Sequence, residues 1–127
     1  MATVYIEKER CDHVRIVNDT GAALAQYEFA VVGPFAAVAD EVIASGAVGS
    51  LHVEEGIQIQ ASNLTATELT FATSGQAVYL DGDGNFSDTE TEGYYLVGYL
   101  LVAKNANGVI VFEKTRYATV VPAAESE

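Results

Sequence analysis

The chain has 127 residues, half of them hydrophobic, and a formal net charge of −12 at pH 7. This length fits one domain with its own core, and the single cysteine, Cys11, excludes an internal disulfide framework. None of the six Lys and Arg residues lies between Arg15 and Lys104, and no apolar run reaches the roughly 20 residues of a membrane span, so we expect neither a nucleic-acid nor a membrane partner.

The chain begins with TVYIEKER, in which apolar and polar residues alternate as in a β-strand. Because charges appear before any long apolar run, we expect no secretory leader and synthesis in the cytoplasm. We divide the chain into an N-terminal arm or edge strand (1–11), a folded domain (12–121) and a flexible C-terminal tail (122–127).

Short strands with turns between them are predicted for the first half of the domain. HVRIVND alternates, with Val14 and Ile16 inward, and LHVEEGIQIQAS alternates on both sides of a bulge or turn at Glu55-Gly56. FAAVADEVIASGAVG fits a helix by its alanine content, but it also fits a strand followed by an elbow at residues 44–46. Because the run is short for a helix, we expect a strand with at most one helical turn.

The second half is rich in the residues that pleated sheets favour. TELTFAT, QAVYLDG, YYLVGYLLVAK and VIVFEKTRYATVV are all predicted to be strands. Asn107-Gly108 separates the last two of these segments and is a strong hairpin signal. Many short strands at regular spacing predict an all-β barrel or sandwich.

An acidic segment, VYLDGDGNFSDTETEG, fits two interpretations. Asp81, Asp83 and Asn85 occupy positions 1, 3 and 5 of a calcium loop, and Glu92 occupies position 12. Position 6, however, carries Phe86 where an EF-hand needs glycine, and both flanks read as strands rather than helices. The pattern therefore favours a polar hairpin turn and no cofactor. The alternative is a calcium-dependent β-module, of the carbohydrate-binding kind, that uses this loop.

No pattern in the chain indicates catalysis. His13 and His52 are far apart in sequence, and each is expected to face solvent or to lie at a sheet rim. Cys11 and His13 share one face of a strand, but no third group is at hand to orient them. A phosphate-binding glycine loop and a nucleophile elbow are both missing. We therefore expect a protein that is not an enzyme.

The order of several segments resembles a known family. The segments are TGAALAQYEFAVVG, IASGAVGSLHVEEGIQI, SGQAVYLDGDGNF and YLVGYLLVAKNANGVIVF, and they extend over about residues 12–115. Their order and spacing are similar to those of phage capsid decoration (cement) proteins. The chain departs from that pattern in its longer C-terminal end and in the acidic segment 81–92.

The resemblance implies a compact β-barrel or β-tulip-like domain of short antiparallel strands. It also implies a structural virion protein on the outer capsid surface that cements neighbouring major capsid subunits against internal DNA pressure. The implied partner is the major capsid protein, and the implied state on the capsid is a homotrimer. The resemblance supplies no catalytic residues.

The N-terminal arm is the expected capsid contact. It is strand-prone and holds two of the few cations, so it could add an edge strand to a capsid subunit. The candidate contact residues are Val4, Tyr5, Ile6, Lys8 and Arg10. Pairing of the arm within its own domain is an equally open alternative.

Overall fold

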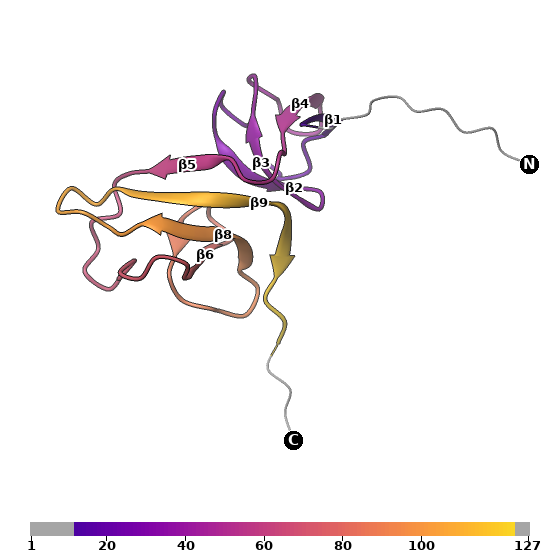
Figure 1. Ribbon diagram of the computed structural model, residues 1–127. Coiled ribbons are helices and arrows are strands. Elements are labelled where there is room, and N and C mark those ends of the chain that lie inside the picture. The colour runs from indigo at the N-terminus through magenta and orange to yellow at the C-terminus, as the bar shows by residue number, and fades with distance from the viewer. Residues whose placement is uncertain (1–11, 124–127) are drawn as a thin grey trace, which may run out of the picture.

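The computed structural model describes residues 12–123, which fold into nine strands with no helix (Figure 1). The strands are β1 (His13–Val17), β2 (Phe29–Val32), β3 (Phe35–Ala39), β4 (Val48–His52), β5 (Gln58–Ala61), β6 (Ala77–Leu80), β7 (Phe86–Ser87), β8 (Tyr95–Val102) and β9 (Ile110–Val120). Within these residues, no helix could cross a membrane. The predicted arm 1–11 and most of the tail 122–127 lie outside the described residues, so these two boundaries stay predictions.

All strand pairs are antiparallel, in the order β1-β4-β3-β9-β8-β6-β7, with β2 added on β3 and β5 added on β9. The predicted all-β class of short antiparallel strands is confirmed. The sheet differs from a closed barrel, because β1 and β7 end the path and no pairing in the described chain joins them. The result is an open, sandwich-like arrangement.

Two hydrophobic cores lie on opposite sides of the β2–β3 hairpin. Ala36 belongs to one core and its neighbour Ala37 to the other, because successive residues of a strand point to opposite faces. In β2, Val31 packs against the first core and Val32 is buried in the second. The hairpin is therefore a shared wall between two halves, which Figure 1 shows as the β1–β4 half above and the β5–β9 half below.

Strand β9 connects the halves. Its residues from Ile110 to Glu113 pair with β5, and further along Tyr117 pairs with Phe35 of β3. Gly98 of β8 lies close to Phe112 and Glu113 of β9. A Cβ added at Gly98 would lie 2.5 Å from the carbonyl oxygen of Glu113 and 2.6 Å from the Phe112 ring, so this contact requires glycine.

Most sequence-predicted turns occur where expected. Asn107-Gly108 lies in the β8–β9 hairpin, and Gly108 has φ 72°. Glu55-Gly56 forms the turn before β5, and 35–49 contains β3 and an elbow instead of a helix.

The strand predicted for TELTFAT does not form. The backbone N–H of Thr70 donates to the Asp88 carboxylate instead of to a strand neighbour. The Phe71 side chain is nevertheless buried in the first core. Residue type predicted the burial of this segment correctly, but its backbone hydrogen bonds go to loop partners.

A buried amide, Asn18, organises the β1–β4 half. Its side-chain N–H group donates to the carbonyls of Ala22 and Ile43 at 2.8 and 3.0 Å, and its Oδ1 accepts from Thr20 Oγ1 at 2.7 Å. Asn18 is 1% exposed, so these bonds replace water entirely. One side chain thus holds the loop after β1 against the elbow before β4.

Candidate functional site

The arm residues expected to contact a partner, Val4, Tyr5, Ile6, Lys8 and Arg10, lie outside the described residues. The structure does describe β1, the strand that follows the arm. Within residues 12–123, β1 pairs with β4 on one side and with no strand on the other. An edge strand presents unpaired backbone groups to which another chain can add. The arm thus precedes a strand whose second edge is unpaired within residues 12–123.

A protruding turn lies close to the same half of the molecule. Tyr27 is 75% exposed and has φ 69°, which is rare for a bulky residue. Its backbone N–H donates to the Ala39 carbonyl at 2.7 Å, and the neighbouring Gln26 side chain donates to the Asp40 carbonyl. The turn is therefore fixed against the end of β3, with an aromatic ring held in solvent.

The two histidines, which are far apart in sequence, lie together. Pairing of β1 with β4 places His13 opposite His52, and their rings stack with centroids 4.3 Å apart. His13 Nδ1 lies 2.6 Å from Asp40 Oδ2, and Ser50 Oγ donates to the same oxygen at 2.7 Å. Burial alone would raise the pKa of Asp40, but the hydrogen bonds from Ser50 and His13 hold it below its ordinary value. Residue spacing carries no signal for this group, because it depends on the register between distant strands.

The acidic segment forms a hairpin between β6 and β7. Asp81 Oδ1 accepts from the backbone N–H groups of Asp83 and Asn85 at 2.8 and 2.9 Å, and the Asp81 N–H donates to the Asn85 carbonyl. These bonds are those of an Asx turn, as the hairpin interpretation expects. The calcium alternative with Asp81, Asp83, Asn85 and Glu92 stays a prediction, checked by comparing melting in calcium and in chelator.

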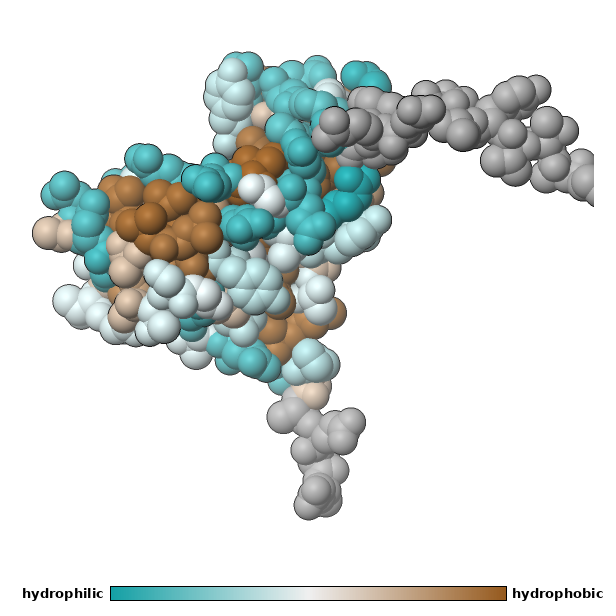
Figure 2. Space-filling view, viewed as in Figure 1, coloured by the Kyte–Doolittle hydropathy of each residue, from teal (hydrophilic) through white to brown (hydrophobic). Residues whose placement is uncertain are grey.

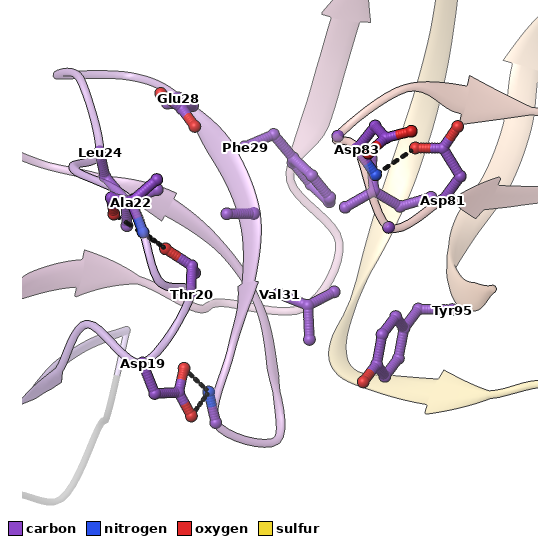
Figure 3. Close-up of a pocket in the computed structure, with 15 residues that line it drawn as sticks. Asp19, Thr20, Ala22, Leu24, Glu28, Phe29, Val31, Asp81, Asp83 and Tyr95 are labelled. Atoms are coloured by element: carbon purple, nitrogen blue, oxygen red, sulfur yellow. Dashed lines mark hydrogen bonds between the residues drawn. The ribbon is translucent and has the colours of Figure 1, made fainter. Parts of the chain in front are cut away.

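A cleft of about 380 Å³ separates this hairpin from β2 (Figure 3). Phe29 and Val31 of β2 line one side of the cleft. Across from them lie Asp81 and Asp83 of the hairpin and Tyr95 of β8. Several of the carboxylates that line the cleft accept hydrogen bonds from the backbone of turns. Asp19 accepts from the Gly33 N–H, and Glu28 accepts from the Ala25 N–H. Three of the four carboxylates that line the cleft, those of Asp19, Glu28 and Asp81, therefore accept hydrogen bonds from backbone N–H groups.

Hydrophobic side chains gather on the surface of the β5–β9 half, as the brown area of Figure 2 shows. The exposed large apolar residues of β8 and β9 are Tyr99, Leu101, Val102, Tyr117 and Val120. Tyr117 stacks on Phe35 at 5.5 Å, and the Arg116 guanidinium lies over both rings. Exposed apolar and aromatic side chains of this kind are suited to protein contacts.

Comparisons with known proteins identify a family for this chain. A family model described as "Phage cement protein" matches residues 8–115. No curated protein and no solved structure matches the chain significantly.

Proposed function

Because the chain belongs to the phage cement protein family, we propose that it is a structural virion protein that binds the outer surface of an assembled capsid. Its partner would be the major capsid protein, and its role would be to join neighbouring capsid subunits against the pressure of packaged DNA. Family membership carries this proposal, and the free edge of β1 supports it.

The free edge suggests how binding would occur. An extended segment can add to a sheet edge, where main-chain hydrogen bonds supply affinity and alternate side chains supply specificity. The arm precedes β1, so an arm that pairs with a capsid subunit would be anchored to the domain through a fixed strand. Val4, Tyr5 and Ile6 would supply the apolar contacts of the arm, and Lys8 and Arg10 would supply its charge contacts.

The apolar surface suggests how copies would associate. A closed trimer needs a patch on each protomer that fits a second patch on the next one. Tyr99 and Val102 on β8 and Tyr117 on β9 project from a well-packed sheet, and they would be suited to such a contact. The net charge of −12 would keep the free protein from associating nonspecifically before it reaches the capsid.

The stabilising effect follows from mass action. A protein that binds only the assembled shell shifts the equilibrium between the assembled and dissociated states toward assembly. Many identical contacts on one shell add through multivalency, so each contact can be modest. This role requires no chemical step, in keeping with an expected lack of enzymatic activity.

Co-sedimentation with expanded shells of the parent phage that lack decoration tests the proposal. We expect the full-length chain to pellet with the shells at a saturating ratio and to raise their melting temperature. A full-length chain that stays in the supernatant at every concentration contradicts the proposal.

Charge and apolar substitutions in the arm test its part separately. Ile6→Asp combined with Arg10→Glu should weaken binding by at least tenfold and leave the melting of the free protein unchanged. The matched control is Asp81→Asn with Asp83→Asn, at the acidic hairpin. If the arm variant binds shells normally while the full-length chain also binds, the contact lies elsewhere and only the arm assignment is wrong.

A further inference from the structure

Three possible metal ligands converge on one face of the β1–β4–β3 sheet. One ligand atom from each of His13, Asp40 and His52 lies within 4.8 Å of the other two. In the described part of the chain, this is the one group of three or more His, Cys, Asp or Glu side chains that meets this distance. The three side chains are partly exposed, so an ion could reach them from solvent.

The sheet fixes the positions of these groups. His13 and His52 are direct partners in the β1–β4 ladder, and the Asp40 N–H donates to the Ser50 carbonyl at 3.1 Å. Ser50 and His52 are two residues apart on β4 and therefore share a face. The Ser50 hydroxyl also donates to Asp40 Oδ2 and orients that carboxylate, which is the role that outer hydrogen bonds play around metal ligands.

One ring nitrogen of the group lacks a hydrogen bond. His52 Nε2 is buried and has no hydrogen-bond partner among the described residues. The nearest carboxylate oxygen, Glu54 Oε2, lies 3.5 Å away, which is an ion-pair distance without hydrogen-bond geometry. A buried polar atom without a partner is uncommon and needs a reason. A cation bound by this imidazole would supply one.

The local charge favours a cation. Asp40 and Glu54 each lie beside one of the histidines, and the nearby Arg15 lies 3.9 Å from Glu41. Two imidazole nitrogens and one carboxylate are the donors that zinc and similar divalent transition ions prefer, whereas magnesium and calcium prefer oxygen alone.

We propose that His13, Asp40 and His52 form a site for a divalent transition-metal ion of the zinc class. The ion would replace the hydrogen bond between His13 Nδ1 and Asp40. Zinc–ligand bonds of about 2.0–2.2 Å require the ligand atoms to move closer than they are now, which rotation of these half-exposed side chains provides. The stacked rings would turn their nitrogens toward a common point while the strands stay in place. The ion would then link β1 to β3 and β4 where the arm joins the domain, whether or not the arm binds a capsid.

Titration of the full-length, chelator-treated chain with zinc sulfate tests this site. We expect one zinc ion per chain by calorimetry and a rise in melting temperature of several degrees. Magnesium or calcium chloride at the same concentration should leave the melting temperature unchanged. His52→Ala and Asp40→Asn should each weaken zinc binding by at least tenfold, and Asp81→Asn with Asp83→Asn should have no effect.

Two results would overturn the proposal. The first is a chain that binds no zinc, or that binds it equally well after His52→Ala. The second is zinc binding that is lost with Cys11→Ser but kept in both site variants, because the cysteine would then be the ligand. If the site variants do not fold, X-ray absorption spectroscopy of the wild-type zinc complex tests the site instead. A zinc coordination sphere without two imidazole ligands would contradict the proposal.

Discussion

The two halves of the molecule are stabilised differently. The β5–β9 core contains Phe71 and Phe112, and Phe29 and Phe86 pack against it with ring centroids 5.2–5.7 Å apart. The β1–β4 core contains no aromatic residue among its buried members, and Asn18 anchors the loops beside it. Both halves bury apolar side chains, but the β1–β4 half packs aliphatic residues and adds the hydrogen bonds of the buried Asn18. The histidine cluster and the free edge both belong to the second half.

The largest effect is expected from removing the central aromatic ring of the first core. Phe112 is fully buried and contacts two other phenylalanine rings. Phe112→Ala should lower the free energy of unfolding by about 3–5 kcal/mol, through lost burial and the cavity left behind. Urea denaturation measures this change. A loss below that of a surface substitution would mean that this half does not depend on aromatic packing.

The corresponding test in the β1–β4 half is Asn18→Ala. This change removes the Asn18 donor from the carbonyls of Ala22 and Ile43 and the Oδ1 acceptor from Thr20, all around a buried side chain. Because several hydrogen bonds are lost together, we expect a loss of about 3 kcal/mol. Urea denaturation measures the loss, and hydrogen exchange would locate it in the loops that flank β1 and β4. Exchange that rises equally across β8 and β9 would contradict a division into two halves.

The close contact between Gly98 and β9 is tested by comparing alanine substitutions at Gly98 and at Gly82. A Cβ at Gly98 meets backbone at 2.5 Å, whereas a Cβ at Gly82 meets nothing within 4 Å. Gly98→Ala should therefore cost about 2 kcal/mol through strain in the β8–β9 ladder. Thermal melting of the two variants side by side measures the difference. Equal melting temperatures would show that the ladder adjusts freely.

Lys114, at the junction of the halves, predicts a pH effect. It is 1% exposed, and burial, followed by the nearby Arg116, lowers its pKa from 10.5 to about 8. The unfolded chain then binds more protons between about pH 8 and 10.5, so stability should rise with pH in this window. We expect a gain on the order of 1 kcal/mol, and Lys114→Met should remove it. Urea denaturation of both proteins at pH 7.5 and 9.5 measures the effect, and parallel curves would contradict it.

The smallest change in stability is expected at the surface of the β1–β4 half. Arg15 and Glu41 are both largely exposed and lie 3.9 Å apart. Arg15→Ala should change the free energy of unfolding by less than about 0.5 kcal/mol, because solvent screens this pair. A larger loss, measured by urea denaturation, would show that the charges around the histidine cluster act as one network.

Local patterns in the sequence were sufficient to predict much of the fold. Alternation predicted that Val14 and Ile16 face inward, and both are partly buried in β1. Asn107-Gly108 predicted its hairpin, and the density of acids and glycines after Leu80 predicted the β6–β7 turn. Each of these features depends on residues close together in sequence, whose backbone preferences act without help from the rest of the chain.

Contacts between remote strands decided the rest. Alternation alone cannot say that β1 pairs with β4, so it could not bring His13 to His52 or place Asp40 beside them. The double-sided burial of β3 and the open sheet likewise depend on which strands compete for the same edge. The sequence by itself determined most of the strands, their turns and the family. Only the tertiary structure decided their register and neighbours, because pairing energy is shared over the whole sheet while strand and turn preferences are set residue by residue.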